Sequence, residues 1–199
     1  MLALSFGVTR DELIDVVRAV VGARADAVDD DPATAEGLFA YIFGTRHLRA
    51  ILCSKGWLRH RTENIESAKH PTRHLKLVYQ SVDVAASLQR APRAVSGKGA
   101  DADRIIDSAQ GSLFTDEELA RGHFTVRGPI NSGVWFFCVS VNGDDVRAEL
   151  SLPSAIKGSN FFEFLERIFI LRYGDWPDFA LRRSLPLEVA DFDPKVTRK

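Results

Sequence analysis

The chain has 199 residues, of which 45% are hydrophobic and 27% are charged, values typical of a soluble globular protein rather than a disordered one. Its formal net charge is −1 and its pI is near 6.5, which argue against a protein that coats DNA with its whole surface. No apolar run reaches the roughly 18–20 residues that cross a bilayer, and the N-terminus lacks the basic region of a signal peptide.

The charge is sorted along the chain. Residues 1–44 hold three Lys/Arg against eight Asp/Glu, residues 45–98 hold eleven against three, and residues 99–199 hold twelve against sixteen. A basic stretch inside a nearly neutral chain indicates an anionic partner. The acidic run Asp29–Asp31 is the internal alternative, because it lies close to the basic stretch in sequence and could neutralise it.

Two helices are predicted at the N-terminus. Thr9-Arg10-Asp11-Glu12 is a capping box, and apolar residues follow it at helical spacing up to Gly22. Asp29-Asp30-Asp31-Pro32 marks the start of a second helix, and Gly56 marks its end. The apolar stripe of this second helix is expected to consist of Leu38, Tyr41, Ile42, Leu48, Ile51 and Leu52.

The middle of the chain is harder to assign. Residues 57–73 fit either a strand pair or an irregular exposed loop. For 74–90, the spacing of apolar residues predicts a helix, although the composition of 77–84 also suits a strand. A flexible loop is expected over 93–102, followed by short helices, one of which begins at the capping box Thr115–Glu118.

Residues 134–152 carry the clearest strand signal. Asn142-Gly143 between two strand-like runs predicts a type I′ hairpin. With that turn, one face is wholly apolar, formed by the pairs Val139 with Val146, Phe137 with Ala148, and Trp135 with Leu150. Pro153 is expected to end the second strand.

An apolar helix is predicted over 160–171, packed on this hairpin. The predicted fold class is therefore α+β, with an antiparallel sheet built around the hairpin. We expect one domain over 1–199, with a mainly helical half at 1–92, a sheet-plus-helix half at 123–180, and a frayed tail at 195–199.

The basic segment at residues 46–76 predicts a non-enzymatic protein that contacts nucleic acid or another polyanion. Arg and Lys form charge-assisted hydrogen bonds to phosphate, and an exposed Trp can stack on a base. The predicted site consists of Arg46, Arg49, Trp57, Arg59, Arg61, Arg73 and Lys76.

Two other functions are possible on different residues. Aromatic side chains of the C-terminal half, such as Trp135 and Phe161, would suit a protein–protein adaptor or a homo-oligomer. A metal-dependent hydrolase or nuclease would instead need convergent carboxylates, for which the candidates are Asp83, Asp144, Asp145 and Glu149.

No cofactor is predicted, because nucleotide-binding glycine fingerprints are absent. No metal site is predicted either, since Pro71 interrupts the spacing of His70 and His74 that a helical pair of ligands would need. The two cysteines, Cys53 and Cys138, lie in apolar stretches far apart in sequence, which favours buried thiols and a cytoplasmic location without membrane contact.

Overall fold

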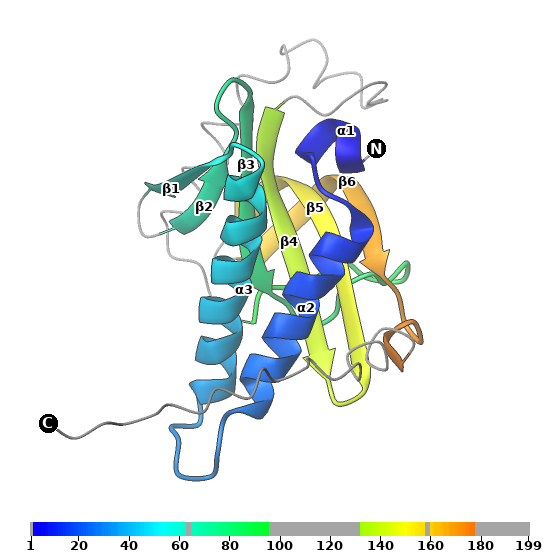
Figure 1. Ribbon diagram of the computed structural model, residues 1–199. Helices are drawn as coiled ribbons and strands as arrows, with labels where there is room; N and C mark the ends of the chain where they lie inside the picture. Colours follow the sequence, from blue (N-terminus) through cyan, green and yellow to red (C-terminus); the bar gives the residue numbers. More distant parts are fainter. Residues whose placement is uncertain (1, 63–64, 96–131, 158–159, 178–199) are drawn as a thin grey trace, which may run out of the picture.

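The computed structural model describes residues 2–62, 65–95, 132–157 and 160–177. Within these ranges three helices precede a mixed sheet of six strands, so the α+β class applies: α1 (Leu2–Phe6), α2 (Arg10–Ala25) and α3 (Ala35–Ser54). The strands follow their sequence order across the sheet: β1 (Leu58–Thr62), β2 (Ile65–Lys69), β3 (His74–Ser81), β4 (Ser132–Asn142), β5 (Asp145–Lys157) and β6 (Asn160–Leu171). Helices α2 and α3 lie side by side against one face of this sheet (Figure 1). None of the described helices has the length and apolar character needed to span a bilayer.

Helix α2 begins at the predicted capping box. The Thr9 side chain accepts a hydrogen bond from the Glu12 amide at 3.2 Å, and the Glu12 carboxylate accepts one from the Thr9 amide at 2.7 Å. These two bonds satisfy amides that a helix start leaves unpaired. The Glu12 carboxylate also pairs with Lys55, just beyond α3, at 2.8 Å, which joins the start of one helix to the end of the other.

Helix α3 turns a different face to the core from the one predicted. Residues from the first half of the predicted stripe are exposed: Leu38, Tyr41 and Ile42. Leu48 and Leu52 are buried as expected, but small residues such as Gly44 form the rest of the buried face. A Cβ atom on Gly44 would lie 2.4 Å from the Tyr79 ring, so the helix approaches β3 more closely than a larger residue permits.

Strands β1, β2 and β3 occupy a region where the sequence left alternatives. Residues 57–73 contain the strand pair β1–β2, whereas the helix predicted over 74–90 is wrong because 74–81 form β3. Leu77 and Tyr79 lie in the core beneath the helices, and Val78 lies in a second cluster on the other face. A strand buried on both faces loses the apolar–polar alternation that would identify it, and its apolar spacing then resembles that of a helix.

The sheet is mixed rather than purely antiparallel. Strand β4 pairs with β3 in parallel, from His74 opposite Ser132 to Ser81 opposite Val139. All other neighbouring pairs are antiparallel. Two antiparallel three-stranded units, β1–β2–β3 and β4–β5–β6, are therefore joined by one parallel pair.

The β4–β5 hairpin forms, but its turn is one residue later than predicted. Asn142 pairs with Asp145, which leaves Gly143 and Asp144 as the turn residues. Of these two, only Gly143 has a positive φ, at 58°, which is the pattern of a type II′ turn rather than type I′. Val139 consequently pairs with Ala148 instead of Val146. The shift moves each partner by two positions, so the predicted apolar face is retained and lies in the core.

Residues 160–171 form strand β6, so the predicted helix is wrong. Ile168 and Ile170 pack with the helix-side core, whereas Phe161 and Phe164 belong to the cluster on the opposite face. Apolar residues on both faces again imitate a buried helix. Pro153 lies inside β5 rather than at its end, and the β5–β6 register shifts on either side of it.

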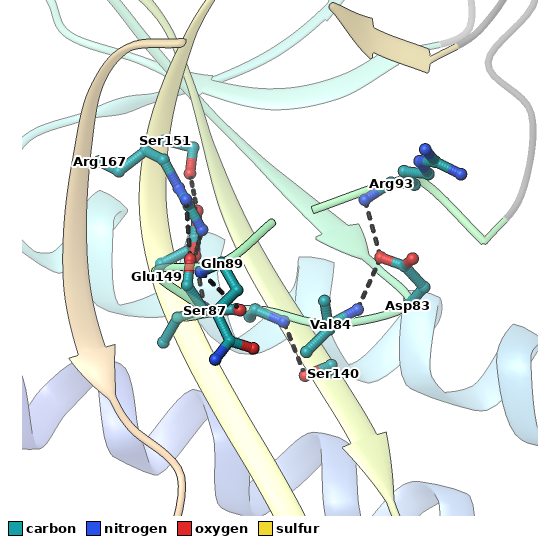
Figure 2. A network of polar contacts seen from close by, with 11 residues as sticks. Asp83, Val84, Ser87, Gln89, Arg93, Ser140, Glu149, Ser151 and Arg167 are labelled. Atoms are coloured by element: carbon teal, nitrogen blue, oxygen red, sulfur yellow. Dashed lines mark hydrogen bonds and ion pairs between the residues drawn. The ribbon is translucent and has the colours of Figure 1, made fainter. Parts of the chain in front are cut away.

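Residues 82–87 cross the face of the sheet opposite the helices (Figure 2). Ser140 Oγ and the Glu149 carboxylate accept hydrogen bonds from backbone amides of this segment. Arg167 forms a bidentate ion pair with Glu149, with N–O distances of 2.8 and 2.7 Å, and donates to a carbonyl of the segment at 3.0 Å. Because Glu149 is fully buried, these bonds compensate a charge that would otherwise be costly to remove from water.

The loop expected over 93–102 lies mostly outside the described residues. Its first part is placed: the Arg93 carbonyl accepts a hydrogen bond from the Asp83 amide at 2.9 Å, and Ala94 bridges to Val82. The short helix expected from Thr115 and the tail at 195–199 fall entirely outside the described residues.

Candidate anion-binding site

The sheet separates the predicted basic residues onto two faces. Arg59 pairs with Ala68, which belongs to the core beneath the helices, so Arg59 and Arg61 lie on the helix side. Lys76 pairs with Lys69 and lies on the opposite face, because successive residues of a strand point to opposite sides. The seven predicted site residues therefore do not form one surface.

Arg49 connects α3 to the first two strands. Its Nε donates to the Ser67 carbonyl at 3.0 Å, and its Nη2 donates to the His60 carbonyl at 2.6 Å. The same Nη2 lies 2.5 Å from the Glu66 carboxylate, which is also 3.5 Å from Arg61 Nε. With 19% of its side chain exposed, Arg49 is occupied by contacts within the protein. Glu66 is therefore the carboxylate that neutralises part of the predicted site.

Trp57 is buried, with 4% of its surface exposed. Its ring meets the His70 ring edge-on, at a centroid distance of 5.2 Å. Base stacking requires an exposed aromatic face, so the role predicted for Trp57 does not fit this position.

The three remaining predicted arginines lie on three different parts of the chain. Arg46 is exposed on α3, where its guanidinium lies over the Phe43 ring at 4.6 Å. Arg59 is exposed on β1, and Arg73 is partly buried in the turn that precedes β3.

The acidic run Asp29–Asp31 lies at the opposite end of α3 from strands β1 and β2 (Figure 1). Helix α3 has 20 residues, which corresponds to a length of about 30 Å. Asp31 accepts a hydrogen bond from the Val28 amide at 3.0 Å, within the connection between α2 and α3. Among the described residues, no ion pair joins this run to the basic segment.

A different group of basic side chains comes together on the face opposite the helices. Lys69 of β2 and Lys76 of β3 are directly opposed in antiparallel register. His60 of β1 lies on the same face, opposite Ser67. Neither lysine has a carboxylate within ion-pair distance in the described part of the chain, which does not include Glu63. We refer to His60, Lys69 and Lys76 as the cationic sheet face.

The members of the cationic sheet face disfavour one another's positive charge. Burial lowers the pKa of the Lys76 ammonium, and the charge of Lys69 lowers it further. Burial also lowers the pKa of His60, with further contributions from Lys76, Lys69 and Arg49. Both directions are those expected where positive groups are collected with no carboxylate of the described residues among them.

Hydroxyl groups hold the imidazole of His60 in place. Ser67 Oγ lies 3.1 Å from its Nδ1, and Thr62 Oγ1 lies 3.2 Å from its Nε2. A hydroxyl can donate or accept, so these contacts are compatible with either the neutral or the protonated ring. Ammonium, imidazole and hydroxyl groups on one face are the donors that bind phosphate oxygens.

Sequence reasoning selected Lys76 for the site but missed Lys69 and His60. The two-residue period of a strand could have identified them, because it places His60 on the opposite face from Arg59 and Arg61. That period could be applied only to a region assigned as strand, whereas the sequence left 57–73 open and favoured a helix over 74–90.

Three of the four carboxylates considered for a hydrolase are engaged within the fold, and the fourth, Asp144, is exposed in the β4–β5 turn. Glu149 pairs with Arg167, and Asp145 forms a bidentate pair with Arg147 at 2.7 and 2.6 Å. Asp83 accepts hydrogen bonds from two backbone amides at 2.7 and 2.8 Å. In the part of the chain that the structure describes, no three metal-ligating side chains gather.

The aromatic residues proposed for an interface contribute mainly to the two apolar clusters. Trp135 and Phe137 lie in the helix-side core, and Phe161 packs against Phe136 on the other face. Tyr173, by contrast, is exposed. Because these rings are packed inside the protein, few of the described aromatic side chains are left to form a docking surface.

A cavity of about 790 Å³ lies between the first turns of α3 and the end of β3. Leu38, Tyr41 and Gly37 of α3 line it together with Gln80 and Ser81 of β3. Because Lys76 lies nearer the other end of β3, the cavity is separate from the cationic sheet face.

No protein-family model, no curated protein and no solved structure matches this chain.

Proposed function

We propose that this chain binds nucleic acid through phosphate groups held at the cationic sheet face. The observation that carries this proposal is the direct opposition of Lys69 and Lys76, with His60 beside them and no carboxylate paired with either lysine among the described residues. Like charges opposed across two strands destabilise a sheet. A phosphate group between them would replace this repulsion with two charge-assisted hydrogen bonds.

Recognition of the backbone fits this face better than recognition of bases. Phosphate contacts position a nucleic acid without reading its sequence, and lysines provide such contacts. The ring that was expected to stack on a base, Trp57, is buried. The exposed His74 lies two residues before Lys76 on the same face and extends the polar surface along β3. The expected interaction is therefore salt-dependent and tolerant of sequence.

Binding without catalysis is the simplest activity for these groups. Three of the carboxylates that a metal-dependent hydrolase would use are engaged in ion pairs or backbone hydrogen bonds, on β5 and the segment after β3 rather than beside Lys69 and Lys76. The cationic sheet face itself supplies positive charge and hydroxyl groups, which bind phosphate.

A salt titration tests the proposal. Fluorescence anisotropy with a labelled, mixed-sequence oligonucleotide should show affinity that falls as salt rises, because phosphate contacts release counterions. In the variant K69Q/K76Q two contacts are removed, and the slope of log K against log salt should become shallower by about 1.4–1.8.

The variant R46Q/R59Q is the matched control. It removes the same number of charges from the same stretch of sequence, but from α3 and from the helix side of the sheet. Its binding should stay close to that of the unaltered chain. Absence of binding at low salt, or equal losses in the two double variants, would refute the proposal.

A further inference from the structure

We infer that phosphate binding at the cationic sheet face is coupled to protonation of His60, so that the site holds a phosphate backbone more tightly below neutral pH than above it. This inference rests on the proposed function and assigns a regulatory role to one of its residues. It concerns the imidazole specifically, because the ordinary pKa of histidine, about 6.5, lies near neutral pH, whereas that of lysine is about 10.4.

The geometry places His60 among charges of one sign. Lys69 of β2 and Lys76 of β3 share its face, as does the exposed His74. From α3, Arg49 reaches the carbonyl of His60 at 2.6 Å. Glu66 belongs to the other face of β2 and is paired with Arg49 and Arg61. A proton added to His60 therefore enters an environment that is already positive.

The direction of the pKa shift follows from this arrangement. Burial and the charges of Lys76, Lys69 and Arg49 hold the pKa of His60 below 6.5, so the ring is neutral at neutral pH. A bound phosphate group would offset the lysine charges and add an attraction of its own, which raises the pKa of the ring in the complex. Wherever the pKa is higher in the complex than in the free chain, binding takes up a proton and affinity increases as pH falls.

The hydroxyl contacts allow the ring to gain this proton without leaving its place. Ser67 Oγ lies beside Nδ1 and Thr62 Oγ1 beside Nε2, and each hydroxyl can accept a hydrogen bond from a protonated ring nitrogen. Protonation thus adds a third positive charge beside the phosphate, with little rearrangement of β1.

The test measures affinity against pH at constant ionic strength, with an oligonucleotide that lacks terminal phosphates so that the ligand itself does not titrate. Between about pH 8 and about pH 5.5 the affinity of the unaltered chain should rise, by at most tenfold per pH unit for a single proton. The variant H60N should lose most of this rise, whatever its affinity at the upper end of the range. The control H47N alters a histidine of α3 that contacts Phe43 and should keep the rise.

The outcomes separate this inference from the proposed function. Salt-dependent binding with the same pH dependence in H60N and the unaltered chain would overturn the coupling and leave the proposed function intact. A pH dependence lost equally in H47N and H60N would also overturn it. Absence of oligonucleotide binding at every pH would overturn both. Equal unfolding temperatures of H60N and the unaltered chain at the upper end of the range would show that the substitution leaves the fold intact.

Discussion

Lys69 and Lys76 face each other across strands β2 and β3, in register and on the same side of the sheet. Cross-strand neighbours on one face have Cβ atoms about 4.5–5.5 Å apart, so the two positive charges are held close by the backbone pairing itself. This arrangement costs stability and has no described internal counterion. Both features indicate a ligand-binding role for the two lysines.

Reversing one of these charges should increase stability and weaken binding. In K69E the new carboxylate would face Lys76, so the free energy of unfolding should rise by about 0.2–1 kcal/mol while oligonucleotide affinity falls. Urea denaturation and anisotropy measure the two effects on one preparation. R59E, whose cross-strand neighbour is Ala68, is the control and should show no comparable gain in stability. A loss of stability in K69E would contradict this account of the pair.

Breaking the buried ion pair should be among the most damaging single changes. R167M leaves the Glu149 carboxylate buried without its bidentate partner, and loss of one partner of such a pair typically costs about 3–5 kcal/mol. Chemical denaturation measures the loss. The double variant E149Q/R167M also removes the unpaired Glu149 charge and should recover part of the lost stability. If the double variant is no more stable than R167M, the buried charge is not the cause of the loss.

Two glycines of α3 should respond oppositely to the same substitution. G44A places a Cβ atom 2.4 Å from the Tyr79 ring, so crowding should destabilise the fold by about 1–3 kcal/mol. G37A meets nothing within 4 Å and should stabilise the helix by up to about 1 kcal/mol, because alanine is the better helix former. Thermal unfolding of both variants gives the comparison, and a similar response at the two positions would contradict the close approach of α3 to β3.

The stability contributed by Glu166 should depend on pH. Burial raises its pKa above 4.5, which means that the folded state disfavours the charged carboxylate. The folded state therefore binds this proton more tightly than the unfolded state, and stability is lost as pH rises through the raised pKa. E166Q should unfold at a higher temperature than the unaltered chain at neutral pH, and this advantage should shrink in acid. E163Q, at an exposed position of the same strand, is the control, and a comparable gain in that variant would show that burial of Glu166 is not the cause.

The parts of the fold that the sequence predicted are those specified locally. The capping box at Thr9 and the alternation of Val139 and Phe137 with their β5 partners depend on residues a few positions apart, and both the helix start and the apolar face are as expected. The turn was displaced because Gly143 supplies a positive φ at the first turn position, which a type II′ turn uses equally well.

The parts that could not be predicted depend on what covers each strand. Strands β3 and β6 are apolar on both faces, so their spacing matched a helix until their neighbours were known. The candidate site also depends on how neighbouring strands pair. The opposition of Lys69 to Lys76 is a property of the β2–β3 register, and a count of charges along the chain grouped these lysines with arginines of the other face.

The single parallel pair also determines how the chain must assemble. Strands β1–β2–β3 and β4–β5–β6 can each form by pairing between neighbours in sequence, with short loop closures. The junction of β3 with β4 must instead close the connection from residue 82 to residue 131 before it gains any contact. Because long-range strand pairing slows folding, we expect the pairing of β3 with β4 to be the late, rate-limiting step. Substitutions along this pair should slow refolding only where the contacts they remove are already formed in the transition state.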